Sequence, residues 1–114
     1  MCYNVTAMSW VVESLSDSVD KELENLPVDV RAKFIHICEL IEKFGHEQVG
    51  MPHVSHLDGP LWEMRMKSSR ALYVKVPHKR VIVVRVFMKK TQKTARREID
   101  LALQRAKNIL GETG

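Results

Sequence analysis

The sequence predicts an α+β fold in which helices pack on one face of a small, mainly antiparallel sheet. Helical apolar stripes flank a central region, and that region reads as three strands joined by short turns. The 114 residues, 45% of them apolar, are enough for one modest core. We therefore expect a single domain over residues 1–114, ordered strand, helix, helix, three strands, helix, with flexible ends at 1–8 and 111–114.

The N-terminal part predicts one strand and two helices. Residues 10–12 form a short aromatic and β-branched run that is typical of a strand. Ser16 or Asp17 can cap a short helix, and Pro27 ends it. The second helix carries an apolar stripe, and Gly45 stands where a glycine commonly terminates a helix. The stripe consists of Val30, Phe34, Ile37, Ile41 and Phe44.

Residues 46–60 are rich in glycine, proline and polar residues, which predicts a loop. His53 and His56 lie three residues apart, but Asp58 alone hardly completes a metal site with them, so we expect no metal. A histidine of this loop is a candidate for proton transfer if the loop covers the functional site, because histidine titrates near neutrality.

Three strands follow at residues 61–67, 70–76 and 80–88, with tight turns between them. They predict an antiparallel meander. A final helix begins after Thr94 and ends at Gly111. Its apolar stripe contains Ile99, Ala102, Leu103, Ala106, Ile109 and Leu110.

Charge is distributed unevenly between the two halves of the chain. Residues 1–57 carry four Lys or Arg against nine Asp or Glu, whereas residues 58–114 carry fourteen against five. This asymmetry indicates a polyanion on the basic side and a different partner on the acidic side. The alternative is that solvated faces segregate by chance.

The stretch "MKKTQKTARREI", residues 88–99, gathers five cations before its first acid, Glu98. A helix N-terminus normally favours acidic residues, so this arrangement predicts a bound anion. The cations are Lys89, Lys90, Lys93, Arg96 and Arg97.

The predicted meander brings further cations near this stretch. Arg65 and Arg85 lie on different strands, while Arg70 shares the parity of core residues and reaches the basic face only if a turn or bulge redirects it. Arg85 either pairs with an acid or faces a ligand. Arginine suits phosphate, and a lysine crowded by cations, Lys89 or Lys90, is a candidate for proton transfer.

Neighbouring side chains leave several assignments open. Glu63 is a base or, with greater weight, a structural ion-pair partner. Tyr73 and Phe87 stack on unpaired bases or belong to the core. No serine-nucleophile arrangement, glycine-rich phosphate loop, cofactor motif or signal peptide pattern is visible, and no apolar run approaches the roughly 20 residues that span a bilayer. We expect a cytoplasmic protein without a membrane partner.

The stretches "HLDGPLWEMRMKSSRALYVKV" and "RVIVVRVFMKKTQKTARREIDLALQRAKNI" resemble the HigB-like, phage-derived branch of the RelE/ParE toxin superfamily. The resemblance spans roughly residues 27–110 and is most specific at "KKTQKT". It implies the small RelE-type α+β domain and a toxin of a type II toxin–antitoxin system. It also implies cleavage of messenger RNA, commonly on the ribosome and without a metal or cofactor, and a helix-turn-helix antitoxin as partner.

Carried over residue by residue, the resemblance implies a set of catalytic residues, and the cations and aromatic residues near them predict a set of substrate-binding residues. Ala95 stands where proline is usual, and Arg85 stands where related sequences often have histidine. The implied catalytic residues are Arg65, Arg70, Lys89 and Lys90, and the substrate-binding residues are Arg85, Phe87, Thr91, Lys93, Arg96 and Arg97.

Two other functions remain open from the sequence. One is a ParE-like gyrase inhibitor that acts through a protein surface. The other is a non-catalytic RNA-binding module, in which the same cations bind phosphate with a steep salt dependence.

Overall fold

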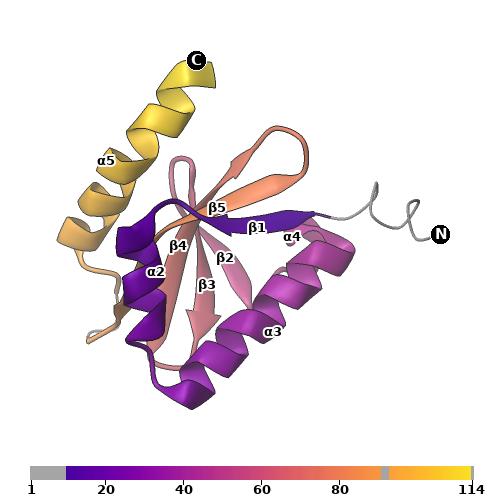
Figure 1. Ribbon diagram of the computed structural model, residues 1–114, viewed down its shortest axis with the longest axis vertical. Coiled ribbons are helices and arrows are strands. Elements are labelled where there is room, and N and C mark those ends of the chain that lie inside the picture. The colour runs from indigo at the N-terminus through magenta and orange to yellow at the C-terminus, as the bar shows by residue number, and fades with distance from the viewer. Residues whose placement is uncertain (1–9, 91–92, 114) are drawn as a thin grey trace.

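A computed structural model describes residues 10–90 and 93–113 of the chain (Figure 1). The elements follow in the order strand, three helices, four strands, helix. They are β1 (Val11–Ser14), α2 (Asp17–Glu24), α3 (Val28–Phe44), α4 (His46–Val49), β2 (Val54–Asp58), β3 (Leu61–Met66), β4 (Ser69–Val76), β5 (Arg80–Met88) and α5 (Arg96–Thr113).

The strands form one five-stranded sheet in the order β1-β5-β4-β3-β2. The predicted meander of β3, β4 and β5 is confirmed, with antiparallel pairs such as Arg65 opposite Arg70. β1 lies parallel to β5, with Val12 opposite Val81. The sheet is therefore mixed, and the first strand of the chain pairs with the last.

The prediction of a loop over residues 46–60 is wrong in two places. Residues 46–49 form the short helix α4, and β2 pairs with β3 at the sheet edge, with Val54 opposite Met64. β2 contains only one fully buried side chain, that of Val54, together with Ser55, His56 and Asp58. Its pattern resembles a polar loop because an edge strand of this kind is partly solvated.

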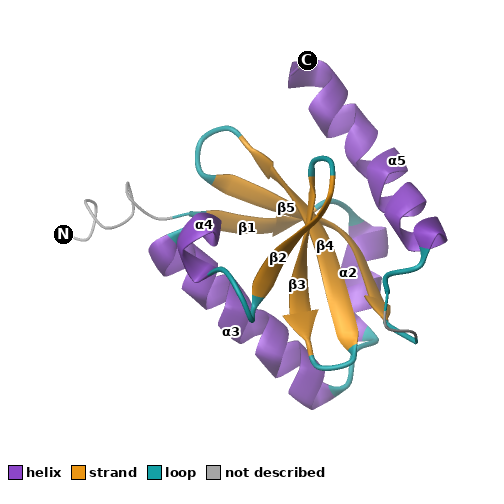
Figure 2. Ribbon diagram, turned by 180° about the vertical axis from the view of Figure 1, so that it is seen from behind, coloured by secondary structure: helices purple, strands orange, loops and turns teal. Residues whose placement is uncertain are grey.

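Helices cover both faces of the sheet, contrary to the prediction that they share one face. In Figures 1 and 2 the sheet fans out between α3 on one side and α5 on the other. α2 and α3 cover a core that includes Val19, Ile37, Ile41, Met64, Met66, Ala71 and Tyr73. α5 covers a second core that includes Leu61, Leu72, Val74, Ile82, Val84, Phe87, Ile99, Ala102 and Ala106.

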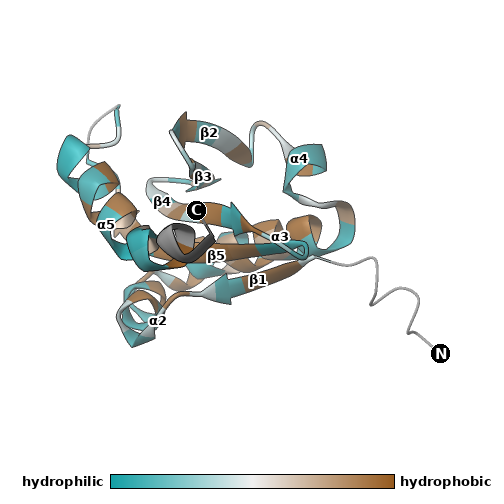
Figure 3. Cartoon of the chain, turned by 90° about the horizontal axis from the view of Figure 1, so that it is seen from above, coloured by the Kyte–Doolittle hydropathy of each residue, from teal (hydrophilic) through white to brown (hydrophobic). Residues whose placement is uncertain are grey.

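The hydropathy colouring follows these two layers (Figure 3). Brown segments line the sheet and the inner sides of the helices, and teal segments face outward on α2 and α5. The predicted stripe of the second helix is confirmed at Val30, Ile37 and Ile41, which are buried, whereas Phe44 is 59% exposed. Successive side chains of β3 and β4 thus point alternately into the core under α3 and the core under α5.

The helix ends agree with the sequence except at the C-terminus. Ser16 stands at the N-cap of α2, although its side chain accepts no capping hydrogen bond, and Gly45 follows α3 with a φ of +83°. A Cβ at Gly45 would stand 2.8 Å from Trp10 Nε1, so close approach to Trp10 adds to the need for glycine there. α5 continues to Thr113, beyond the end predicted at Gly111. No described helix is both long and apolar enough to cross a membrane.

Candidate functional site

Three of the four predicted catalytic residues meet on the α5-facing side of the sheet. Arg65 on β3 lies opposite Arg70 on β4, and Arg70 lies opposite Phe87 on β5. Lys89 directly follows β5, and its backbone N–H donates to Ser68 O at 2.6 Å. The β3–β4 turn thus holds the start of the lysine run beside the two arginines.

Arg70 is buried, with only 7% of its surface exposed. This confirms the core parity expected for it from the sequence. Its Nη1 donates to Lys67 O at 2.8 Å and to Ser69 O at 2.9 Å, while Nε lies 3.8 Å from Glu63 Oε1 without a hydrogen bond. Arg70 therefore stabilises the β3–β4 turn, and its buried positive charge lies beneath the surface formed by Arg65 and Lys89.

Glu63 lies on β3 between these cations and the β5–α5 segment. It is buried, and it accepts hydrogen bonds from Ser55 Oγ at 3.1 Å and Thr94 Oγ1 at 3.5 Å. With Arg70 Nε 3.8 Å away, the ion-pair interpretation of Glu63 agrees with the geometry. This burial does not suit a catalytic base, because a base has to contact the ligand.

The pKa of Lys89 lies below its usual range. Burial is the main cause, and the positive charge of Arg70 adds to it, followed by a smaller contribution from Arg65. Glu63 acts in the opposite direction and raises the pKa. The sequence-based expectation that cationic neighbours lower a lysine pKa is confirmed at Lys89, with burial as the larger cause.

Most of the remaining predicted cations line a cleft between the end of β5 and the start of α5, here called the β5–α5 cleft. Its volume is about 370 Å³, and its walls combine apolar and charged side chains. Val86, Phe87, Met88 and Ala95 line it together with Arg85, Lys89, Lys90, Lys93, Arg97 and Glu98.

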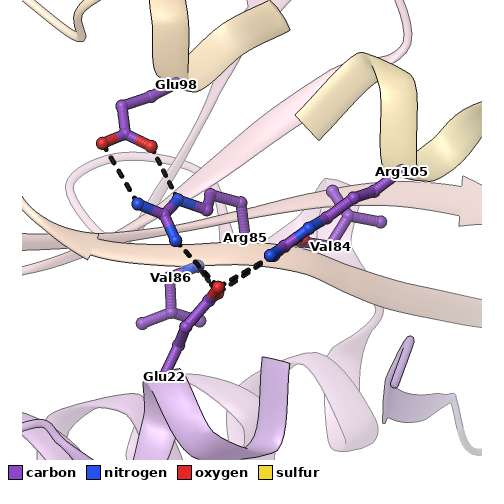
Figure 4. Close-up of polar contacts among 6 residues, drawn as sticks. All are labelled: Glu22, Val84, Arg85, Val86, Glu98 and Arg105. Carbon is purple, nitrogen blue, oxygen red and sulfur yellow. Dashed lines mark hydrogen bonds and ion pairs between the residues drawn. The ribbon is translucent and has the colours of Figure 1, made fainter. Parts of the chain in front are cut away.

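Arg85 is engaged by two carboxylates (Figure 4). Its Nε and Nη2 donate to Glu98 at 2.6 and 3.3 Å, and its Nη1 donates to Glu22 Oε2 at 2.8 Å. The hydrogen bond to Glu98 is the main reason why the pKa of Arg85 lies above its usual range. Of the two interpretations that the sequence left open, pairing with an acid is the one observed.

The same network supplies hydrogen-bond partners to backbone groups of β5 that lie beyond the end of β1. A register shift against Leu72 and Tyr73 leaves Val84 without a partner on β4. Val84 O accepts from Arg105 Nη1 and Val86 N–H donates to Glu22 Oε1, both at 2.9 Å. Side chains of α2 and α5 therefore replace a neighbouring strand at this edge.

Stacking of Phe87 and Tyr73 on RNA bases does not agree with their burial. Phe87 is 8% exposed and belongs to the core under α5, and Tyr73 is fully buried on the α3 side. Both aromatic residues pack in the cores, which is the alternative that the sequence left open.

The other substrate-binding candidates separate in space. Lys93 and Arg97 line the β5–α5 cleft. Arg96 is not among the residues lining it and instead pairs with Asp58 at 2.9 Å and Asp100 at 3.0 Å. Thr91 lies outside the residues that the structure describes.

The histidines of residues 46–60 lie on the α3 side of the sheet. His53 contacts the ring of His36 on α3, and the rings of His46 and His56 contact Trp62. The carbonyl of His53 accepts the N–H of Arg65 at 2.8 Å, but the three imidazole rings contact His36 and Trp62 on the α3 side, so proton transfer by one of them at this site is not supported. Within the described ranges, no group of three or more His, Cys, Asp or Glu residues is placed to hold a metal ion.

Two residues of the site escaped the sequence reasoning. Glu22 and Arg105 join α2, β5 and α5, although Glu22 lies 64 residues before the Val86 amide that it binds. No local pattern distinguishes them from ordinary charged residues on the surface of a helix.

Comparisons with known proteins agree with this architecture. The model of the family described as "Phage derived protein Gp49-like (DUF891)" matches residues 21–107. A search of the curated proteins finds no match.

Solved structures of RelE proteins share the fold. The RelE–RelB complex of Pyrococcus horikoshii OT3 matches with a TM-score of 0.57 and 22% identity, covering 72% of this chain and 97% of that chain. The RelBE2 complex of Mycobacterium tuberculosis gives 0.55 and 16%, covering 71% and 92%. A free mutant of the Escherichia coli toxin RelE gives 0.60 and 19%, covering 86% and 98%.

These likenesses confirm the RelE-type α+β fold that the sequence resemblance implies. Because the family model covers most of the chain, this protein belongs to the Gp49-like phage-derived family and has the fold of the RelE toxins.

Proposed function

We propose that this protein is the toxin of a type II toxin–antitoxin system and cleaves messenger RNA on the ribosome. The observation that carries the proposal is the convergence of Arg65, Arg70 and Lys89 beside the basic β5–α5 cleft. Such a group of cations suits a chain of phosphates and stabilises charge that accumulates on one of them. The proposal places the protein in the cytoplasm, where its substrate is found.

The reaction that fits these residues is attack of a ribose 2′-hydroxyl on the adjacent phosphate. A bond forms between the 2′ oxygen and phosphorus, and the bond to the 5′ oxygen breaks, leaving a cyclic phosphate and a 5′-hydroxyl. Arg65 and Lys90 hold the phosphate, and buried Arg70 stabilises its extra negative charge from behind. The reaction needs no metal in this scheme.

Proton transfer is assigned to Lys89 or to a group supplied by the bound substrate. A lowered pKa increases the fraction of Lys89 that is neutral near physiological pH, which favours a role as base. The 2′-hydroxyl proton passes to this base, and the 5′ oxygen takes up a proton from water as it leaves.

The partner that neutralises the toxin is a cognate helix-turn-helix antitoxin in this proposal. Two of the similar structures are complexes of RelE with RelB or of RelBE2, which supports an antitoxin partner. The exposed charges of the β5–α5 segment, Lys90, Lys93 and Arg97, offer contacts to either RNA or antitoxin.

The test is expression of the wild-type chain, Lys89→Ala and Arg65→Ala, followed by primer extension on cellular messenger RNA. We expect cuts at defined codons and growth arrest with the wild type, and a loss of about a hundredfold or more in cleavage with Lys89→Ala. Lys107→Ala, an exposed lysine of α5, is the matched control and should cleave normally. Circular dichroism checks that each variant folds.

Other outcomes separate the alternatives. Growth arrest with intact messenger RNA and impaired DNA supercoiling would replace the proposal with a gyrase inhibitor. Salt-sensitive RNA binding without cuts would leave a non-catalytic RNA-binding module. Equal cleavage by the wild type and both variants would remove Arg65 and Lys89 from the site.

A further inference from the structure

Glu63 is a buried acid in a group of residues that is otherwise cationic. Its side chain is 10% exposed, and that of Arg70 is 9% exposed. A buried carboxylate costs several kcal/mol unless charges and hydrogen bonds compensate it. The position therefore calls for a role that a neutral side chain cannot fill.

The partners of Glu63 come from three different parts of the fold. Ser55 donates from β2 and Thr94 donates from the segment before α5, while the Nε of Arg70 on β4 faces Oε1 at 3.8 Å. That Nε is buried and has no hydrogen-bond partner. The negative charge of Glu63 is what compensates it.

Glu63 also contacts Thr94, which lies between the lysine run and α5. Lys89, directly after β5, donates its backbone N–H to Ser68 O. Thr94 Oγ1 donates to Glu63 Oε1 at 3.5 Å, two residues before α5 begins. Lys89 is thus anchored to the β3–β4 turn, and Thr94 is anchored to β3.

Charge links Glu63 to Lys89 as well. Arg70 and Arg65 act on Lys89 as like charges, and Glu63 is the opposing charge among the groups acting on it. Burial lowers the pKa of Arg70, and Glu63 counteracts this effect. Because Glu63 is buried and does not line the β5–α5 cleft, it acts through these neighbours and not on a ligand.

We propose that Glu63 is a positioning residue for RNA cleavage: its carboxylate holds Arg70 and Thr94, and through them fixes Lys89 against the cleft. The inference rests on the proposed function only in the step from a fixed Lys89 to faster cleavage. The arrangement of Arg70, Thr94 and Lys89 around Glu63 is independent of the substrate.

The first experiment measures Lys89 directly, without RNA. Protein carrying ¹³C-labelled lysine is titrated by NMR, with the Lys89 signal assigned from Lys89→Arg. Glu63→Gln keeps the size and one acceptor oxygen but removes the charge, so we expect the pKa of Lys89 to fall further. Glu47→Gln, which loses an exposed carboxylate paired with Lys75, is the matched control and should leave the Lys89 titration unchanged.

The second experiment measures single-turnover cleavage on programmed ribosomes as a function of pH. We expect Glu63→Gln to move the pH profile toward lower pH and to cut the maximal rate about ten- to a hundredfold, because a small misplacement of Lys89 is costly. KM should change little. Thr94→Val, which loses only the hydroxyl, should lower the rate without moving the profile.

Unchanged Lys89 titration in a folded Glu63→Gln protein would overturn the proposal. If Glu63→Gln does not fold, Thr94→Val decides, and an unchanged cleavage rate in that variant overturns the link to the segment. If the wild type cleaves no RNA, the proposed function fails, while the NMR titration still decides whether Glu63 controls Lys89.

Discussion

His46 shows how strongly burial changes a single side chain in this fold. It is 1% exposed, its ring edge contacts Trp10, Trp62 and Tyr73, and its Nε2 has no partner. Burial is the main cause of a pKa below the usual value, and the charge of Lys75 adds to it, while Glu47 acts in the opposite direction. His46 is therefore neutral in the folded protein at neutral pH.

This burial predicts a loss of stability on mild acidification. The unfolded chain takes up the His46 proton below about pH 6.5, whereas the folded protein does so only at lower pH. The contribution of neutral His46 to the free energy of unfolding is fully present above the unfolded pKa. It is lost as the pH decreases through the pKa of His46 in the folded protein. Urea unfolding at pH 7 and pH 5 should show a smaller acid loss for His46→Phe than for the wild type.

The control is His78→Asn, in an exposed turn where asparagine tolerates the φ of +69°. It should retain the acid loss of the wild type. An equal acid loss in His46→Phe would assign the effect to other groups.

At the scale of elements, the end of β5 is stabilised by helices where a neighbouring strand is missing. Glu22 of α2 binds Arg85, Arg105 and the Val86 amide, and Arg105 also binds Val84 O. Since β1 reaches only to the partner of Val83, these side chains satisfy backbone groups that would otherwise be orphaned. The network also connects α2 and α5 across the edge of the sheet.

Glu22→Ala should therefore destabilise the protein by about 2–3 kcal/mol, because it removes one acceptor from each of two arginines and the acceptor of the Val86 amide. The free energy of unfolding in urea measures this loss. Glu24→Ala, an exposed glutamate on the same helix, should change it by less than about 0.5 kcal/mol. Similar losses in the two variants would contradict the structural role of Glu22.

Across the whole molecule, acidic and basic residues are divided between the elements of the N-terminal half and those of the C-terminal half. The acidic N-terminal half supplies β1, α2 and α3, and the basic half supplies β3, β4, β5 and α5. Arg65, Lys89, Lys90 and Lys93 form a surface whose field attracts polyanions, and the attraction weakens with salt.

Binding of a short single-stranded RNA should therefore weaken steeply as salt increases. Each phosphate contact contributes about 0.7 to the slope of log K against log salt concentration. Arg65→Ala should reduce the slope by about one such contact, and Lys107→Ala should leave it unchanged. Fluorescence anisotropy across a salt series measures the slopes, and equal slopes in all three proteins would show that Arg65 makes no phosphate contact.

Periodicity made much of this fold predictable from the sequence. The apolar stripe of α3 apart from Phe44, the meander of β3, β4 and β5, and the parity that buries Arg70 follow from local patterns and are confirmed. β2 was not predicted, because the polar pattern of this edge strand is also typical of a loop. The placement of α5 opposite α3 escaped because alternation on a strand does not say which helix covers which face.

By itself, therefore, the sequence determined the secondary elements other than α4 and β2, the gathering of cations near the end of the last strand and the resemblance to RelE-like toxins. Tertiary structure decided which charges are available to a ligand. Arg85 is paired with Glu22 and Glu98, Phe87 is buried under α5, and Glu63 forms an ion pair with buried Arg70. The physical reason is that an ion pair or a buried position depends on side chains far away along the chain, which local patterns do not encode.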